Sequence, residues 1–331
     1  MTALLPELDS ERISALLRSA SDDDKTVLQA IHPAQIDHRL EIARRFFGSI
    51  SGAGGGGAGL DIEGKAVLEV GCGQGDMTVV LAELVGEKGR VVAIDPAPLT
   101  YGSPLTLGEA QAVLQKTAVG SRMTFLQADV PSFFSQQAPE QPSSPTRPQS
   151  FDTAILAHCL LYFSSAAELS QTLTELRRSA RVQHLCLAEW DLAASRSEAV
   201  PHLLALLAQA FLPQAEANVR TLFSREQVRR IAEGAGWRLR CESTIVSPPR
   251  MQDGRWEVDL ALGLEAARLR SVHSAARLRS VHSAARVESE RERDVTTFST
   301  MCDSIRAHLP TPGSSKGVAC VDVWTAVFDA V

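Results

Sequence analysis

The chain has 331 residues, of which 44% are hydrophobic, enough for a sizeable core in one large domain or two smaller ones. Its formal net charge of −6 and its isoelectric point near 5.8 argue against a nucleic-acid partner, because proteins that bind phosphates of nucleic acids usually carry a basic surface. A small-molecule partner is favoured.

The cysteines and the first residues indicate the compartment. No two of the six cysteines form a CxxC pair, so we expect reduced, mostly structural thiols and no metal site. The sequence has no apolar run long enough to span a bilayer, and it begins without the basic start and long apolar core of a signal peptide. We therefore expect a soluble, cytoplasmic protein with no membrane partner.

Residues 1–50 are predicted to form an N-terminal helical extension. One helix is expected from Ser10 to Arg18 and a second from Pro33 to Phe47, where proline suits the first helical position. The glycine-rich residues 51–59 lack the flanking elements and the Lys-Ser/Thr pair of a phosphate-binding loop, so we interpret them as a flexible linker. Residues 60–331 are then expected to form one domain with insertions.

The stretch from Lys65 to Val85 predicts a strand, a glycine loop and a helix. An apolar run passes through Glu69 into glycines at positions 71, 73 and 75, and apolar residues then recur at helical spacing. Such a loop lets the backbone approach a ligand closely at a helix N-terminus. The dinucleotide pattern GxGxxG would need glycine in place of Asp76, and a turn without any ligand is the other alternative.

Two further strands are expected to end in carboxylates. The segment Arg90–Asp95 follows the first helix as a βαβ unit requires, and Met123–Asp129 is another short strand. An ionised carboxylate offers two acceptor oxygens, so Asp95 can accept both ribose hydroxyls of a nucleoside. Dehydrogenases share an acid at this strand end, which therefore leaves the class of nucleoside open.

The glycine motif E-x-G-x-G-x-G, the acids at 95 and 129 and the segment Phe151–Phe163 together resemble the class I S-adenosylmethionine-dependent methyltransferases. The motifs stand in the order and at about the spacing of that family, and the resemblance covers residues 60–192 well. It implies S-adenosylmethionine as the cofactor and Asp129 as the acceptor of the adenine amino group. The implied cofactor-binding residues are Glu69, Gly71, Cys72, Gly73, Gln74, Asp95, Pro96, Asp129, Val130 and His158.

The same resemblance implies an α/β fold with a doubly wound, mostly parallel seven-stranded sheet. We expect an antiparallel edge strand, N-terminal helices, a helical insert before the last strand, and insertions at 96–105, 136–150 and 250–316. In the family, N-terminal helices cover the cofactor pocket, so His38 or Arg39 could meet the methionine carboxylate. The alternative is that both are surface residues of an amphipathic helix.

The second half of the chain continues the pattern of helices and strands. A capping box at 224–227 predicts the start of one helix. The other expected elements are helices at Ala166–Ala180 and Val200–Leu212 and strands at His184–Asp191, Trp237–Val246 and Gly317–Phe328.

The insert contains a tandem repeat, because residues 266–274 recur without change as 275–283. Nine residues advance a helix by about 900°, half a turn beyond two whole turns, so the apolar pairs of the two copies point to opposite faces. We interpret the repeat as a duplication tolerated in an exposed helix. An arginine-rich arm for RNA or an acidic partner is the alternative.

Methyl transfer from a sulfonium is an in-line displacement, so the protein mainly holds donor and acceptor in line and excludes water. A hydroxyl acceptor benefits from a general base, for which the candidates are His158 after the fourth strand and Glu189 or Asp191 at the end of the fifth. His158 could instead be a packing residue whose backbone lines the cofactor pocket. The histidines without comparable context are His32, His202, His273 and His282.

We therefore predict a methyltransferase that acts on a small-molecule acceptor. One alternative keeps the fold and the cofactor site but not turnover, as in a regulator or a pericyclic scaffold. An NAD-dependent oxidoreductase is the less favoured alternative, weakened by Asp76 and by the acid at position 129.

Overall fold

The computed structural model describes residues 10–19, 33–48, 57–103, 105–135, 150–178, 182–212, 218–277 and 285–331, and only the backbone within 269–293. Most of the expected linker 51–59 and of the expected insertion 136–150 therefore lies outside the described residues. The same is true of His32 and His282.

Seven strands form one sheet in the order β3-β2-β1-β4-β5-β7-β6. They are β1 (Ala66–Val70), β2 (Arg90–Asp95), β3 (Met123–Gln127), β4 (Phe151–Ala157), β5 (Val182–Trp190), β6 (Trp237–Ile245) and β7 (Val323–Ala330). Strands β1 to β5 run parallel, and β7 runs antiparallel to its neighbours β5 and β6 at one edge of the sheet. The expected doubly wound, mostly parallel seven-stranded sheet is confirmed.

The chain winds outward in two directions from the neighbouring strands β1 and β4. From β1 it continues to β2 and β3, and from β4 it continues to β5. The carboxyl ends of these strands lie at one edge of the sheet, and open α/β sheets bind ligands where the strand order reverses. The loops after β1 and β4 are therefore the place to look for a site.

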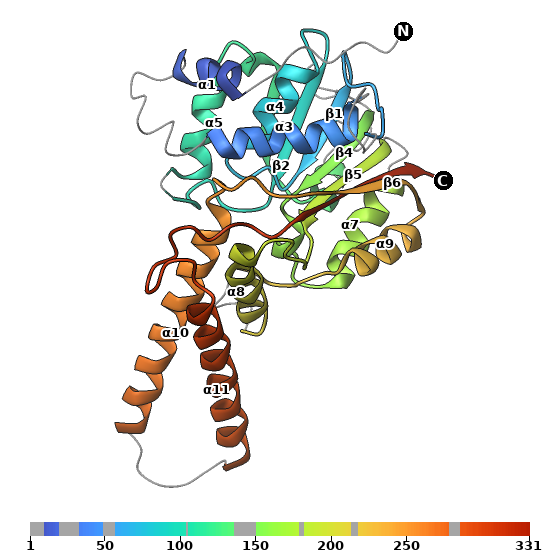
Figure 1. Cartoon of the computed structure of the whole chain (residues 1–331). Helices are drawn as coiled ribbons and strands as arrows, with labels where there is room; N and C mark the ends of the chain where they lie inside the picture. Colours follow the sequence, from blue (N-terminus) through green and yellow to red (C-terminus); the bar gives the residue numbers. More distant parts are fainter. Residues whose placement is uncertain are drawn as a thin grey trace.

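Helices cover both faces of the sheet (Figure 1). The described α-helices, including α10 and α11, which project away from the sheet, are α1 (Ser10–Ser19), α3 (Pro33–Phe47), α4 (Asp76–Leu84), α5 (Leu107–Gln115), α6 (Val130–Ser135), α7 (Ala166–Arg178), α8 (Val200–Ala210), α9 (Arg225–Gly234), α10 (Asp253–Arg277) and α11 (Ala285–Ala307). Successive strand residues point to opposite faces, so Val67 packs in the layer of α3 and α4, and Leu68 in the layer of α6, α7 and α9.

Helix α3 lies across one face of the sheet, as Figure 1 shows. Its side chains Ile36, Ile42 and Phe46 are fully buried in the core on this face. Burial of each stabilises the fold by about 1.5–3 kcal/mol, which is enough to hold the N-terminal helix on the domain. The polar residues of the same helix are thereby fixed above the carboxyl edge of the sheet.

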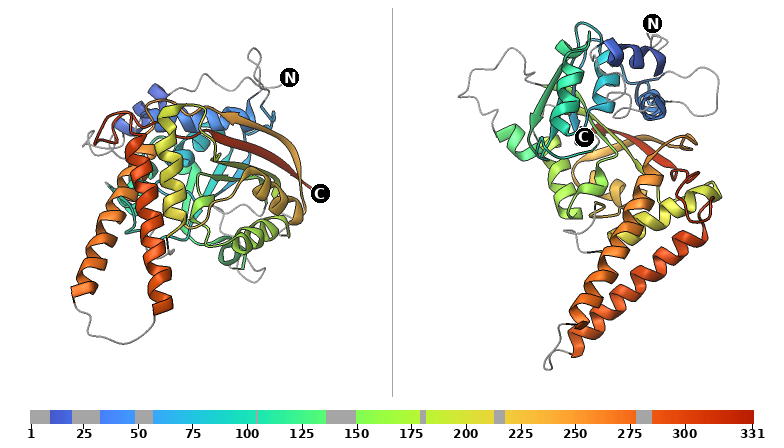
Figure 2. Two further views of the ribbon diagram at one scale, coloured as in Figure 1. Left: turned by 60° about the horizontal axis from the view of Figure 1, so that its bottom comes forward. Right: turned by 90° about the vertical axis from the view of Figure 1, so that its left-hand side faces the viewer.

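The insert between β6 and β7 is helical, as expected, and it consists of two helices, α10 and α11. Helix α10 runs away from the body and α11 runs back, and both pack on α8 at their base (Figures 1 and 2). Val258, Phe298 and Ile305 are fully buried in this contact. The first copy of the repeat lies in α10 near the far end of the pair, and most of the second copy lies outside the described residues.

The last strand begins at Val323 rather than at Gly317, so this expected boundary is wrong. The backbone before Val323 hydrogen-bonds elsewhere: the N–H groups of Ala319 and Asp322 donate to the carbonyls of Glu198 and Ala193. Glu198 lies within the short helix η3 (Ser197–Ala199) and Ala193 lies in the loop before it, and both are outside the sheet. Pairing with a loop therefore replaces pairing with a strand over these residues.

The structure also describes the capping box, the cysteines and the lengths of the helices. Both hydrogen bonds of the capping box at 224–227 are present at the start of α9. All six cysteines are free thiols. Among the described helices, none combines the length and the apolar character needed to cross a bilayer.

Candidate active site

All three glycines of the loop after β1, Gly71, Gly73 and Gly75, have a positive φ, a conformation in which other residues are strained. Gly71 has φ of 75°, and a Cβ there would lie 2.5 Å from the Cβ of Cys159 in the loop after β4. Gly73 has φ of 52°, but a Cβ there would meet no heavy atom of the described residues within 4 Å. Gly71 thus lets two loops pack together, whereas the backbone of Gly73 borders a space that the described residues do not fill.

Asp95 at the end of β2 holds the glycine loop. Its Oδ2 accepts from the N–H of Gly73 at 2.9 Å, and its Oδ1 accepts from the N–H of Ala97 at 2.9 Å. The amide of Gln111 donates to the carbonyl of Gly73 at 2.9 Å. A carboxylate has about four lone-pair sites, so Asp95 keeps acceptor capacity for hydroxyl groups of a ligand.

The neighbours of these residues complete the loop. The amide of Gln74 donates to the carbonyl of Leu105, which ties the loop to the insertion at 96–105. Cys72 is buried, and Pro96 is exposed directly after Asp95. These side chains therefore shape the loop rather than offer it charged groups.

Glu69 at the end of β1 is buried, and its Oε2 accepts from the hydroxyl of Thr78 at 2.6 Å. Burial raises the pKa of Glu69 to about 8, and the hydrogen bond from Thr78 opposes this shift. The group is therefore largely protonated at neutral pH unless a cation binds beside it.

Asp129 follows β3 and is exposed. Its Oδ1 accepts from the N–H of Ser132 at 2.8 Å, which caps α6, and the buried Val130 begins that helix. The carboxylate thus has a structural role at the helix start, and its Oδ2 takes no part in this hydrogen bond.

Helix α3 contributes Arg39, which pairs with Asp76 at the start of α4. The Nη2 and Nε atoms of Arg39 lie 2.9 and 3.2 Å from Oδ2 of Asp76. Arg39 is only 8% exposed, so the alternative of an ordinary surface residue is wrong. Its Nη1 is buried and finds no hydrogen-bond partner among the described residues, which leaves a charged donor ready for an anionic group.

His38 and His158 form a buried pair. Their Nε2 atoms lie 2.8 Å apart, and Nδ1 of His158 lies 3.5 Å from Oε1 of Glu189. Burial lowers the pKa of both rings well below the usual value, so both are neutral at pH 7. His38 is fully buried, so it too is no surface residue.

The carboxylate of Glu189 favours one arrangement of protons in this pair. Backbone N–H groups of Leu160 and Trp190 donate to it at 2.7 and 2.9 Å, and burial raises its pKa to about 7. When ionised, it favours a proton on Nδ1 of His158 through its charge, although these two atoms make no hydrogen bond in the described structure. Nε2 of His158 then accepts from Nε2 of His38. Nδ1 of His38 is left as a free acceptor, since it has no partner within the described structure.

The backbone of His158 is strained. Its φ of 53° is the only positive value at a non-glycine residue in the described part of the chain, and its N–H donates to the carbonyl of Ala188 at 2.8 Å. Such a conformation costs on the order of 1–3 kcal/mol and persists where surrounding structure holds it. Strand β5 thus fixes the ring in place.

Trp190 lies among three histidines. Its ring is nearly parallel to that of His38, and the centroids of these two rings are 6.0 Å apart. The centroid of the Trp190 ring lies 4.2 Å from that of His158 and 5.2 Å from that of His202. His202 on α8 accepts from the N–H of Val321 at 3.1 Å, and burial lowers its pKa to about 3. The site therefore contains a histidine for which the sequence offered no context.

The third candidate base, Asp191, lies in a different contact. Both of its oxygens meet the guanidinium of Arg225, at the start of α9. Of the three candidate catalytic residues, the structure brings His158 and Glu189 together, whereas Asp191 joins β5 to α9. A structural role for Asp191 is the simpler interpretation.

The polar residues of α3 could have been found from helical spacing. Gln35, His38 and Arg39 occupy positions i, i+3 and i+4 of a face that continues with Ile42 and Phe46, all of them buried. Polar residues within an apolar stripe are unusual in a surface helix. This pattern signals a helix that covers a polar site.

The fold, the glycine loop and the acids at the ends of β1 and β2 and after β3 are those of the class I S-adenosylmethionine-dependent methyltransferases, and the chain belongs to that family. A family model described as a methyltransferase domain matches residues 61–227. The protein is therefore a methyltransferase, and S-adenosylmethionine is its cofactor.

Individual relatives agree with this class. The chain is 30% identical over 301 residues to methyltransferase phomM of Diaporthe leptostromiformis and 29% identical over 302 residues to methyltransferase phomM' of the same organism. Each match covers 80% of this chain and 73% of the relative. A solved structure, a cyclopropane-fatty-acyl-phospholipid synthase-like protein from Lactobacillus casei, is 26% identical with a TM-score of 0.67, over 96% of this chain and 99% of that one.

Proposed function

We propose that this methyltransferase transfers a methyl group to a small-molecule acceptor at the carboxyl edge of the sheet, between the glycine loop and the pair His38–His158. The observation that carries the proposal is the free Nδ1 of the buried, neutral His38 beside a glycine loop with open space at Gly73. The acidic net charge of the chain also favours a small acceptor over a nucleic acid.

The cofactor fits the residues of this edge. When bound, S-adenosylmethionine supplies a methyl group on a positively charged sulfur. Nη1 of Arg39 is a buried charged donor suited to the methionine carboxylate, and Asp95 retains acceptor capacity suited to the ribose hydroxyls. Asp129 is the residue that we assign to the adenine amino group, and the bare backbone of Gly73 permits close approach.

The histidine pair has a role in removing a proton from the acceptor. An acceptor that loses a proton as it attacks can pass that proton to Nδ1 of His38, which is neutral at pH 7. His158 and Glu189 act as positioning residues, because they hold His38 in the tautomer whose Nδ1 carries a lone pair. Buried surroundings exclude water from this transfer.

The test is methyl transfer to a metabolite extract from methyl-labelled S-adenosylmethionine, followed by mass spectrometry. The wild type should place label on a small molecule. His38→Ala and His158→Ala should lower labelling by about 10²–10⁴-fold while affinity for S-adenosylhomocysteine stays within about threefold. His308→Ala, at an exposed position directly after α11, is the matched control and should retain full activity.

Two results would contradict the proposal. Label that appears only on protein or nucleic acid would exclude a small-molecule acceptor. Full activity of His38→Ala would remove the histidine pair from the reaction, and a parallel loss of cofactor affinity would assign the pair to the cofactor pocket instead.

A further inference from the structure

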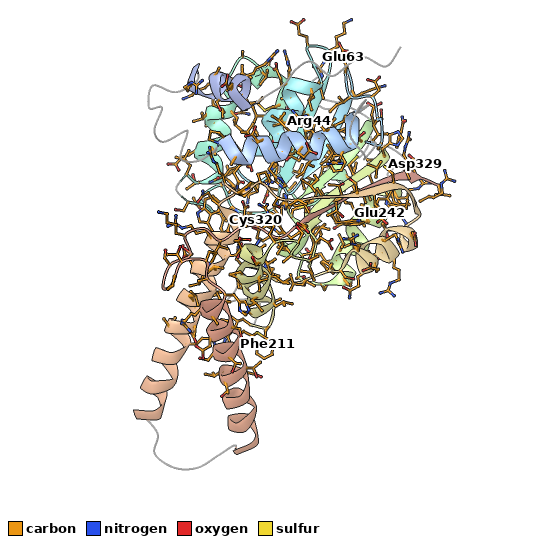
Figure 3. All side chains as sticks on the ribbon, in the orientation of Figure 1. Arg44, Glu63, Phe211, Glu242, Cys320 and Asp329 are labelled. Carbon is orange, nitrogen blue, oxygen red and sulfur yellow. The ribbon has the colours of Figure 1, made fainter. Side chains whose placement is uncertain are left out.

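Two carboxylates face the site from the start of α10. Asp253 and Glu257 are one helical turn apart, and so lie on one face of the helix. The helix start is anchored beside the sheet, because the N–H of Gly254 donates to the sulfur of Cys320 at 3.1 Å. Figure 3 labels Cys320 where the chain passes between α10 and the sheet.

Each carboxylate is met by a buried glutamine. The amide of Gln35 on α3 donates to Oδ2 of Asp253 at 2.7 Å, and the amide of Gln209 on α8 donates to Oε2 of Glu257. A carboxylate only accepts, so each glutamine must present its NH₂ group to it. The orientation of both amides is thereby fixed.

The side-chain carbonyl oxygens of these glutamines take no part in these hydrogen bonds. Gln35 is 6% exposed and Gln209 is 0% exposed, and the Oε1 atom of each is buried without a hydrogen-bond partner in the part of the chain that the structure describes. Buried acceptors of this kind normally have a partner. Two carboxylates and two buried carbonyl oxygens, all of them acceptors, therefore gather around the start of α10.

Positive charge is scarce in the same region. Arg39 lowers the pKa of Asp253, but its guanidinium is already paired with Asp76. Burial is the larger effect, and it raises the pKa of both Asp253 and Glu257. A ligand that brings a cation with N–H donors would satisfy both the charge and the free acceptors.

An aromatic side chain connects these carboxylates with the loop after β4. Tyr162 is 46% exposed and lies in the short helix η2 (Leu160–Tyr162), four positions after His158. Its hydroxyl lies 3.5 Å from the amide nitrogen of Asn218, which also hydrogen-bonds Glu257. An accessible aromatic ring beside carboxylates is a common surrounding for an organic cation.

We propose that Asp253, Glu257 and the carbonyl oxygens of Gln35 and Gln209 bind a positively charged nitrogen of the methyl acceptor. The acceptor is thus a molecule that carries a cationic nitrogen, and because an ammonium nitrogen has no lone pair, the charged nitrogen in this contact is not the atom that takes the methyl group. This inference rests on the proposed function, since it names the substrate class of the same site. The ammonium group of the cofactor is the other possible source of a cation, and the experiment separates the two.

The experiment uses full-length protein saturated with S-adenosylhomocysteine and two probes of similar shape, 2-phenylethylammonium and neutral 2-phenylethanol. Calorimetry should show the ammonium probe binding at least about tenfold more tightly than the alcohol. Asp253→Asn and Glu257→Gln should each weaken binding of the ammonium probe by about tenfold or more and leave the alcohol unchanged. Affinity for S-adenosylhomocysteine should stay within about threefold, which also reports on folding.

Asp259→Asn is the matched control, because Asp259 is exposed on α10 and pairs with Arg255. It should behave as the wild type with both probes. Equal affinity of the saturated wild type for the ammonium probe and the alcohol would overturn the inference alone. Loss of S-adenosylhomocysteine affinity in Asp253→Asn or Glu257→Gln with the melting temperature of the wild type kept would also overturn it, by assigning the carboxylates to the cofactor. Failure of the wild type to bind S-adenosylhomocysteine at all would contradict the proposed function as well.

Discussion

Glu69 shows how a single residue of the glycine motif affects both site and stability. It is buried at the end of β1, and its folded-state pKa of about 8 lies far above the ordinary value of 4.5. The folded protein therefore binds the proton of Glu69 more tightly than the unfolded chain does. The stability that this contributes is fully present below about pH 4.5 and is lost as the pH rises through about 8.

We expect Glu69→Gln to flatten the pH dependence of stability in the cofactor-free protein. The wild type should lose up to about 1.4 kcal/mol per pH unit through this group between pH 5 and 8, and the variant should lack that loss. Glutamine can still accept from Thr78, so the fold is retained. The measurement is urea unfolding at pH 6, 7 and 8, with the exposed Glu233→Gln as a control that keeps the wild-type slope. Parallel curves for Glu69→Gln and the wild type would show that Glu69 does not carry the shift.

Residues on local motifs could be predicted from the sequence, whereas residues brought in from distant helices could not. Glu69, Gly71 and Asp95 belong to short strand-and-loop patterns, so their places in the fold follow from the residues next to them in the sequence. His38 and Asp253 act through partners far along the chain: His38 meets His158 across 120 positions, and Gln35 meets Asp253 across 218. Spacing within one helix gives no information about such partners.

Among the helices and strands, the helical insert differs most from what the sequence predicts. A single helix through both copies of the repeat would have placed their apolar pairs on opposite faces. Instead α10 ends at Arg277 and α11 runs back from Ala285, so the first copy, residues 266–274, lies near the far end of α10 (Figure 1). The reversal depends on contacts of both helices with α8, which no local pattern indicates.

Deletion of residues 275–283 should leave the domain intact. The buried contacts of the insert are at its base, where Val258 and Phe298 pack on α8, so the shortened pair can close by unwinding a turn at its far end. We expect the melting temperature to fall by no more than about 4 °C, with unchanged affinity for S-adenosylhomocysteine.

Val258→Ala is the comparison for this deletion. It removes buried methyl groups at the base and should cost roughly 1–3 kcal/mol, hence a larger fall in melting temperature than the deletion. A deletion that destabilises more than Val258→Ala would show that the far end of the pair is packed. Loss of activity with full stability would instead give the repeat a role in substrate access.

At the scale of the whole molecule, the carboxyl edge of the sheet is where separate parts of the chain meet. The N-terminal helix α3, the glycine loop, the loops after β4 and β5, the helix α8 and the start of α10 all contribute polar groups there. The fold could be predicted because its motifs are local and stand in family order. The acceptor side of the site could not, since it depends on how an N-terminal helix and a late insert pack on the same sheet.

The most direct test of this account is a calorimetric titration of S-adenosylhomocysteine into the wild type and Gly73→Val. Valine at position 73 would be strained at φ of 52° and would fill the open place beside the loop, whereas Gly263→Val on α10 is a control with equally open surroundings in the described residues. The account predicts one-to-one binding by the wild type and the control, no measurable binding by folded Gly73→Val, and no binding of NAD. Unchanged affinity in folded Gly73→Val, or binding of NAD as tight as that of S-adenosylhomocysteine, would contradict it.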